Sequence, residues 1–151
     1  MLLHSTSARA LSRYPQVVHD SEGSWIASDE ALIRIVSDLW LFYTTADGLP
    51  SDRVRKVVPD EREVWAATPN GLARMARGSR RWEVYRAPQP LPTDDVFSVA
   101  VDENSVWVAT AAGGVRYDKQ KRSWAPVTTM YGLDKRPIYD VISLGQGVWF
   151  A

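Results

Sequence analysis

Cysteine is absent from the 151 residues, and histidine occurs only as His4 and His19. The chain therefore has no disulfide, no thiolate metal site and no cysteine nucleophile, an absence that fits a reducing or an oxidising compartment. Its longest uninterrupted apolar run, residues 39–43, is far shorter than the roughly 20 residues of a membrane-spanning helix. The 18 Lys and Arg residues balance the 18 Asp and Glu residues, which excludes a general electrostatic attraction to nucleic acid or to an anionic membrane.

Recognisable catalytic and cofactor motifs are also missing. The sequence has no glycine-rich phosphate loop, no zinc-spaced set of His and Cys, and no Gly-x-Ser-x-Gly nucleophile elbow. The acidic pairs Asp60-Glu61 and Asp102-Glu103 lack the further carboxylates at alternate positions that a calcium loop carries, so we interpret them as turn caps. The sequence thus predicts no catalytic residue, no metal ligand and no cofactor.

Tryptophan, in contrast, is frequent, and all seven copies fall into two regular series. Neighbouring members of each series lie about 42 residues apart: Trp25, Trp65, Trp107 and Trp149 form the first series, and Trp40, Trp82 and Trp124 the second. Residues 49–75 also align without a gap with residues 91–117, with 13 identities in 27 positions. The chain is therefore built from an internal repeat whose length equals the tryptophan spacing.

Each repeat contains four short runs typical of β-strands. These runs are rich in β-branched and aromatic residues, which alternate or cluster, and they are bounded by Gly, Pro, Asn and Asp. In one repeat they are residues 54–59, 64–68, 72–77 and 82–86, and in the next they are residues 96–101, 106–110, 115–118 and 124–127. An equivalent innermost strand is expected at residues 14–19. Four strands in such a repeat match a β-propeller blade.

The predicted fold class is all-β: about three and a half blades of a β-propeller, each full blade a four-stranded antiparallel sheet, forming an incomplete ring in one domain. The predicted boundaries are 14–48, 49–90 and 91–132 for the blades and 133–151 for the half blade.

The string DGLPSDRVRKVVPDEREVWAATPNGLARM (47–75), followed by VWVATAAGGVRYD (106–118), resembles the two-component regulator propeller repeat. That repeat has the form DGL-P-x-x-x-V, then an acidic turn, then lW-x-g-T-x-x-G-l-x-r-y-d. The resemblance covers residues 14–151 and is weakest in the first copy, where Asp29-Glu30-Ala31 replaces the turn glycine. It implies an extracytoplasmic sensor region that precedes a membrane span and an output domain, with polysaccharide fragments as a common ligand class.

Fewer blades are present than a closed ring requires. Residues 1–13 are expected to contribute an outer strand (2–5) of a preceding blade, and the chain stops after two strands of the last one. Because a propeller closes to remove its exposed sheet edges, we expect a fragment of a longer protein, completed by the remaining blades. The alternatives are a homodimer, in which two copies make one seven-bladed ring, and an open arc that tends to aggregate.

The repeated aromatic and basic residues have structural interpretations. A tryptophan that recurs at one blade position is expected to pack between blades rather than to stack on a sugar. The recurring arginines, Arg34, Arg74 and Arg116, are expected to form solvent-facing or inter-blade salt bridges rather than an anion-binding ring.

A binding face is expected where residues depart from the repeat. In a propeller this is the face that carries the loops from the outer strand of one blade to the inner strand of the next, together with the turns between the second and third strands. Charge varies there from blade to blade while the flanking Leu and Val stay fixed, as at Asp52-Arg53, Asp94-Asp95 and Arg136-Pro137. The candidate binding residues are Arg53, Asn70, Asp95, Lys135, Arg136 and Tyr139.

Three functions are compatible with this pattern. The first is a ligand-binding or sensory module, taking carbohydrate or another small ligand, as the family resemblance implies. The second is a propeller enzyme similar to the streptogramin lyases, against which the absence of histidine from residues 20–151 argues. The third is a non-catalytic interaction scaffold.

The cellular compartment stays open at this point. The first thirteen residues, MLLHSTSARALSR, lack the apolar stretch of roughly 7–15 residues that a secretory signal peptide needs. A fragment of a sensor would be extracytoplasmic or periplasmic, whereas a complete chain would be cytoplasmic.

Overall fold

The structure is a computed structural model in which residues 15–127, 135–145 and 147–151 are described. These residues form three four-stranded antiparallel sheets and one two-stranded sheet, and the strands of each sheet pair in the order in which they occur in the chain. The first sheet contains β1 (Gln16–Asp20), β2 (Gly23–Ala27), β3 (Leu32–Val36) and β4 (Leu39–Tyr43), and the second contains β5 (Lys56–Pro59), β6 (Glu63–Thr68), β7 (Gly71–Ala76) and β8 (Glu83–Tyr85). The third contains β9 (Val96–Val101), β10 (Ser105–Thr110), β11 (Gly113–Asp118) and β12 (Ser123–Pro126), and the last contains β13 (Val141–Leu144) and β14 (Gly147–Phe150).

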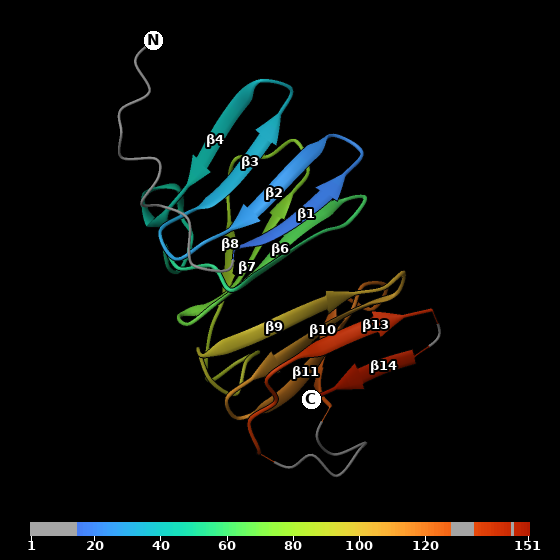
Figure 1. The fold of residues 1–151 in the computed structure, drawn as a ribbon. Coiled ribbons are helices and arrows are strands. Elements are labelled where there is room, and N and C mark those ends of the chain that lie inside the picture. The colour runs from blue at the N-terminus through green and yellow to red at the C-terminus, as the bar shows by residue number, and fades with distance from the viewer. Residues whose placement is uncertain (1–14, 128–134, 146) are drawn as a thin grey trace.

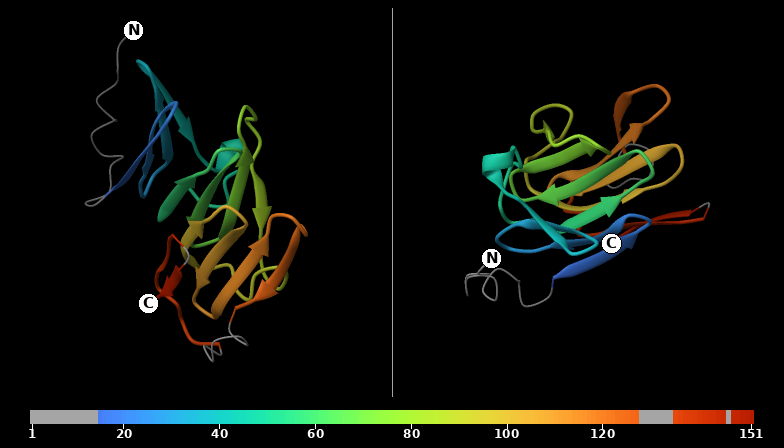
Figure 2. Two further views of the ribbon diagram at one scale, coloured as in Figure 1. Left: turned by 90° about the vertical axis from the view of Figure 1, so that its right-hand side faces the viewer. Right: turned by 90° about the horizontal axis from the view of Figure 1, so that it is seen from above.

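The arrangement confirms the predicted all-β fold of propeller blades in an incomplete ring (Figure 1). We number the sheets as blades 1 to 3 and half blade 4. The first strand of each sheet is innermost: β1 packs beside β5, β5 beside β9 and β9 beside β13. The blades therefore follow one another around this row of inner strands, as the two further views in Figure 2 show. The outer strand expected at residues 2–5 lies outside the described residues.

The turn between the second and third strands is closed in the same way in every full blade. A buried hydroxyl ends the second strand and donates to the carbonyl three residues later, in the pairs Ser28 to Ala31, Thr68 to Gly71 and Thr110 to Gly113. Gly71 has a φ of 132°, and a Cβ there would lie 2.8 Å from the Tyr85 carbonyl oxygen. The glycine of this turn is therefore required by both its backbone conformation and its close packing.

The core lies between neighbouring blades rather than within one. Trp25 of blade 1 is fully buried in a cluster with Val57, Val64 and Met75 of blade 2, and Trp65 of blade 2 is fully buried in the corresponding cluster with blade 3. We call the side of a blade that carries this tryptophan its leading face, because it packs on the next blade. The side that packs on the preceding blade is its trailing face. The predicted inter-blade role of these tryptophans is confirmed.

The second tryptophan series belongs to the trailing faces. The ring of Trp82 in blade 2 lies 5.7 Å from that of Tyr43 in blade 1, edge to face. The ring of Trp124 in blade 3 lies 5.0 Å from Tyr85 and 6.4 Å from Trp65, both in blade 2. The two series are thus the two halves of one repeated inter-blade contact.

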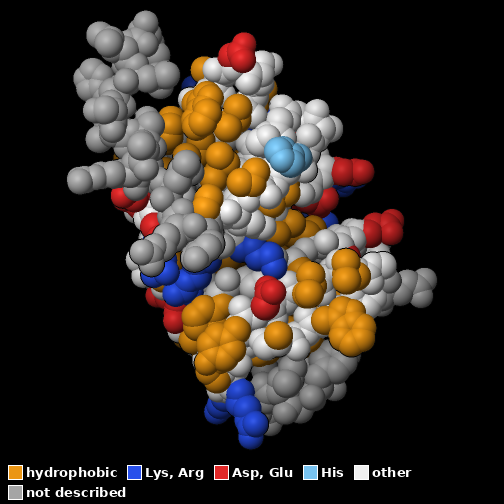
Figure 3. Space-filling model, viewed as in Figure 1, with side chains coloured by type: hydrophobic (Ala, Val, Ile, Leu, Met, Phe, Trp, Pro, Cys, Tyr) orange, Lys and Arg blue, Asp and Glu red, His pale blue; other side chains and the backbone are white. Residues whose placement is uncertain are grey.

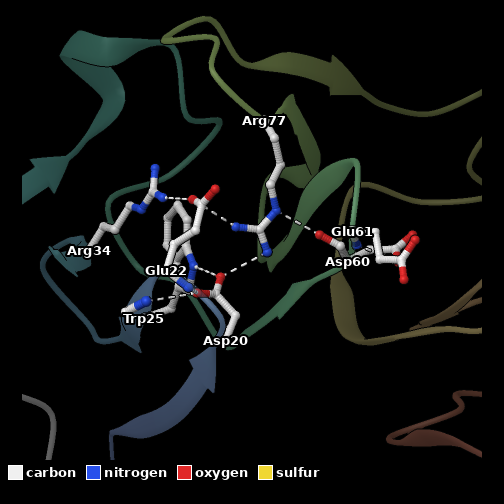
Figure 4. A network of polar contacts seen from close by, with 8 residues as sticks. Asp20, Glu22, Trp25, Arg34, Asp60, Glu61 and Arg77 are labelled. Atoms are coloured by element: carbon white, nitrogen blue, oxygen red, sulfur yellow. Dashed lines mark hydrogen bonds and ion pairs between the residues drawn. The ribbon is translucent and has the colours of Figure 1, made fainter.

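Polar contacts join the turns between the first and second strands of neighbouring blades (Figure 4). Arg77, which follows β7, donates to the Asp20 carboxylate of blade 1 at 2.8 Å and to the Asp60 carbonyl oxygen of its own blade at 2.7 Å. Lys119, one repeat later in sequence and following β11, donates in the same way to the Asp60 carboxylate at 2.6 Å and to the Asp102 carbonyl at 2.7 Å. We call this repeated interaction the basic clamp.

The acidic acceptors of these turns are turn caps, as expected. Asp102 accepts hydrogen bonds from the Asn104 and Ser105 amides and from the Trp107 indole, at 2.9, 2.7 and 2.7 Å. Asp20 does the same in blade 1. Burial acts to raise the pKa of Asp20, but the hydrogen bonds from Trp25, the Glu22 amide and Arg77 outweigh it and hold the pKa below its usual value.

The recurring arginines form the expected salt bridges, some of them with solvent-exposed partners, and each also makes a contact that the sequence did not predict. Each guanidinium lies over the tryptophan of its own blade, with the guanidinium carbon 5.1 Å from the Trp25 ring centroid for Arg34, 5.6 Å from Trp65 for Arg74 and 5.2 Å from Trp107 for Arg116. Arg34 pairs with Glu22, and Arg74 with Glu63, within the same blade. The cause is strand register, because the tryptophan and the arginine are directly opposed on neighbouring strands.

The basic clamp generates a stability prediction. We expect Lys119→Met to lower the free energy of unfolding by about 1–3 kcal/mol, because it removes the hydrogen-bonding partner of two part-buried acceptors. The neighbouring Lys121→Met, at an exposed position, should change it by less than about 0.5 kcal/mol. Denaturant unfolding at neutral pH measures both, and equal effects of the two substitutions would contradict the clamp.

Candidate functional site

The candidate site lies at the start of the inner strands, on the edge reached by the loops that enter each blade. Arg55, Phe97 and Tyr139 occupy the same position in blades 2, 3 and 4, since each is one repeat further along the chain than the last. The Arg55 guanidinium carbon lies 4.8 Å from the centroid of the Phe97 ring, and the Phe97 and Tyr139 rings are 5.2 Å apart at an angle of 34°. The three side chains form one continuous stack, which we call the mouth stack.

Arg55 is held in place by the loop that precedes blade 3. Its Nη1 donates to Asp95 Oδ1 at 2.6 Å and to the Val96 carbonyl oxygen at 2.8 Å. These two bonds fix the plane of the guanidinium over Phe97. At the other end of the stack, Tyr139 is 66% exposed, so one aromatic ring of the stack is open to a ligand.

A second row of polar residues lies one position further along the same strands. Lys56, Ser98 and Asp140 are again separated by one repeat each. Lys56 Nζ donates to Ser98 Oγ at 2.8 Å, to Asp140 Oδ1 at 3.0 Å and to the Val141 carbonyl at 3.1 Å, and Ser98 donates to Asp140 at 2.6 Å. All three protons of the ammonium are used, so this row, the inner clasp, ties blades 2, 3 and 4 together beneath the mouth stack.

The inner clasp also determines the ionisation of Asp140. Burial acts to raise the pKa of this carboxyl, but the hydrogen bond from Ser98 and the hydrogen bond and charge of Lys56 outweigh it. The pKa of Asp140 is therefore lowered, and the carboxylate stays charged and paired at neutral pH.

Two of the predicted binding residues meet in this site. Asp95 anchors Arg55, and Tyr139 ends the mouth stack. Arg53 lies on the same loop edge, where it forms an exposed ion pair with Asp29 at 3.0 Å.

The remaining predicted binding residues lie in other segments. Asn70 is in the turn between β6 and β7, where its backbone amide donates to the Thr68 hydroxyl at 3.2 Å. Lys135 and Arg136 are exposed in the segment before β13, and Lys135 has a φ of 52°. The sequence analysis missed Arg55, Phe97 and the inner clasp. A signal was available, because the residues at these repeat positions differ chemically from one blade to the next.

Two clefts lie between blades 2 and 3. One, of about 620 Å³, is lined by aromatic and proline side chains that include Tyr85, Trp124, Pro88 and Pro90. The other, of about 710 Å³, is lined by charged residues of the strand-connecting turns and includes Arg74 and Lys119. Because Arg74 and Lys119 already have acidic partners in these blades, we assign the polar cleft to the inter-blade contact.

Neither a metal-ligand cluster nor a membrane-spanning helix occurs within residues 15–127, 135–145 and 147–151. These residues contain no group of three or more His, Cys, Asp or Glu side chains that could hold a metal ion. They also form no helix long and apolar enough to cross a membrane.

The fold defines the chain as part of a β-propeller, and solved structures agree. The chain is similar to the extracellular domain of BT4673 from B. thetaiotaomicron, described as a putative hybrid two-component system, with a TM-score of 0.72 and 23% identity over 95% of this chain and 19% of that one. It is also similar to the WD40 domain of Pan2 from Neurospora crassa, with a TM-score of 0.63 and 12% identity, over 100% of this chain and 46% of that one. The chain thus spans about a fifth of the BT4673 domain.

No protein-family model matches the chain, and no curated protein matches it. At these identities the solved structures establish the fold alone.

The inner clasp generates a pH prediction. Because the folded pKa of Asp140 lies below the ordinary aspartate value of 3.8, its contribution to stability is present above pH 3.8 and is lost as the pH falls through the lower folded value. We therefore expect Asp140→Asn to lower the melting temperature at pH 7 and to have a smaller effect at pH 3.

Asp29→Asn provides the matched control, because Asp29 lies in an exposed ion pair with Arg53 and such pairs contribute little to stability. Thermal unfolding followed by circular dichroism at the two pH values makes the comparison. A destabilisation by Asp140→Asn that is as large at pH 3 as at pH 7 would refute the assignment.

Proposed function

We propose that this chain is part of a sensory β-propeller that binds a carbohydrate or a similar small ring-shaped ligand at the mouth stack. The observation that carries the proposal is the exposed Tyr139 ring at the end of a stack whose other members are fixed by Asp95 and the Val96 carbonyl. A preorganised aromatic face with adjacent hydrogen-bonding groups is the usual chemistry of a small-ligand site.

The pattern of variation supports the same proposal. Neighbouring blade positions keep one residue type, as Val57, Val99 and Val141 do, whereas the mouth stack position changes from Arg to Phe to Tyr. The fold requires the valines, since all three are fully buried. It does not require any one side chain in the mouth stack, and loop-edge positions of that kind are where binding residues are found.

The sensory part of the proposal draws on the similarity to the BT4673 extracellular domain, and the sequence resemblance to two-component regulator propellers agrees with it. We infer a non-catalytic role for the same reason, because neither BT4673 nor the Pan2 WD40 domain is described as a catalytic domain. The complete protein would place this module outside the cytoplasm, ahead of an output domain.

An interaction scaffold is the second candidate function, and one observation favours it. The cleft between blades 2 and 3 is lined by Tyr85, Trp124 and several prolines. Such a surface could accept an apolar side chain of a partner peptide.

A glycan titration tests the main proposal. We expect the chain to bind at least one of four neutral hexasaccharides (cello-, xylo-, laminari- and mannohexaose) in isothermal titration calorimetry. Tyr139→Ala should weaken that binding about tenfold, which corresponds to about 1.4 kcal/mol, because the stacking surface is lost. Gln120→Ala, at an exposed turn on the opposite edge, should leave the affinity unchanged. Absence of binding to all four glycans, or binding that survives Tyr139→Ala, would refute the proposal.

A further inference from the structure

The two ends of the blade series carry the two halves of the contact that joins the blades. Half blade 4 ends the series with an uncovered leading face, on which Trp149, Ile142 and Leu144 are 66%, 47% and 65% exposed. Blade 1 begins it with a trailing face on which Trp40, Phe42 and Val17 are 51%, 46% and 50% exposed, whereas Ile33 on the same face is buried. Figure 3 shows hydrophobic side chains gathered over β3 and β4 and, separately, over β13.

The equivalent positions are more buried at the internal contacts than at the two ends, although Trp107 and Trp124 are only half-buried. Trp65, equivalent to Trp149, is fully buried, and Trp82, equivalent to Trp40, is 9% exposed. Val57, Val99 and Val141, equivalent to Val17, are all fully buried. Each end face therefore carries one half of the inter-blade interface that this chain forms internally.

The internal interfaces also show how two such faces meet. Trp124 of blade 3 contacts Trp65 of blade 2 with ring centroids 6.4 Å apart and an interplanar angle of 77°. The equivalent pair at the open ends is Trp149 with the Trp40 of another molecule. The Trp65 part of this contact lies on the second strand of the receiving blade, and half blade 4 has that strand as β14. The tyrosine part, Tyr43 for Trp82 and Tyr85 for Trp124, lies on an outer strand, which is not among the described strands of half blade 4.

The polar part of the interface changes at both ends together. Inside the chain, an aspartate five residues before the tryptophan accepts the basic clamp from the next blade, as Asp20 and Asp60 do. In half blade 4 this acceptor position holds Leu144, and in blade 1 the clamp position equivalent to Arg77 holds Ser37.

The two changes are complementary. A blade that brought Arg or Lys to half blade 4 would bury a cation without its acceptor, which is strongly unfavourable. Blade 1 brings a serine instead, so its trailing face meets Leu144 without an unpaired charge. The leading face of this chain is matched to its own trailing face in both its apolar and its polar positions.

We propose that two copies of this chain associate head to tail, the leading face of half blade 4 in one copy packing on the trailing face of blade 1 in the other. Each copy contributes both faces. A twofold axis through the centre of the ring, around which the inner strands are arranged, would therefore form the contact twice and close one ring. Such closure covers the apolar end faces and leaves neither of them exposed to solvent.

The test is the solution mass of the 151-residue chain and its variants, by light scattering after size exclusion. We expect the parent chain to have twice the monomer mass of 17.0 kDa. Trp149→Glu and Trp40→Glu should each raise the dissociation constant at least tenfold, because either substitution puts a carboxylate into both contacts. Lys121→Glu, which changes an exposed residue in the turn between β11 and β12 of blade 3, away from both end faces, should leave the mass unchanged.

A mixing experiment separates head-to-tail pairing from every other arrangement. In an equimolar mixture of the Trp149→Glu and Trp40→Glu chains, one contact joins an intact Trp149 to an intact Trp40. We therefore expect the mixture to form a heterodimer that neither variant forms alone, and this recovery also shows that both variants are folded.

Three results would overturn the proposal. A monomeric parent chain would mean that blades of a longer chain or a different protein cover the two faces. Loss of the dimer on Trp149→Glu but not on Trp40→Glu would mean that two leading faces meet each other. A mixture of the two variants that stays monomeric would exclude the head-to-tail contact.

Discussion

The packing of one tryptophan on the next blade is the interaction on which the rest of this structure depends. A single four-stranded sheet of this length has no interior of its own, so its apolar residues are buried only when a second sheet covers them. Trp25 and Trp65 supply the largest fully buried side chains of the two interfaces between complete blades. The inner strands, the turns and the mouth stack take their positions from these interfaces.

The tryptophan also organises the polar groups around it. Its indole donates to an acidic residue of the preceding turn, Asp102 for Trp107, and an arginine of the third strand covers its ring. In blade 1 the Asp20 carboxylate accepts both the Trp25 indole and the Arg77 clamp, whereas in blade 2 Trp65 donates to Glu63 and Asp60 accepts Lys119. Apolar packing and the inter-blade ion pairs are thus coupled through one side chain, so a change in either is felt by both.

The repeat made the fold predictable, because periodic Trp, Val and Gly positions report the contacts that all blades share. For that reason the predicted strands of blades 2 and 3 coincide closely with those of the structure. The ion pairs of the arginines were predicted, but their stacking on tryptophan was not, because pairing between strands of one sheet, which opposes Arg34 to Trp25, is set by register rather than by spacing along the chain. Arg55 and Phe97 were missed because no motif marks them, and only the folded inner strands bring them together.

Departures from the repeat therefore have two different meanings, which depend on the element that carries them. At the start of the inner strands, the change from Arg55 to Phe97 to Tyr139 leaves the buried valines intact, so it is free to serve binding. At the turns, Leu144 and Ser37 remove an acceptor and a donor that the internal interfaces use. A lone change of that kind would leave a buried charge unpaired. In the proposed head-to-tail contact the paired change avoids this penalty, because Ser37 brings no charge to the acceptor position that Leu144 occupies.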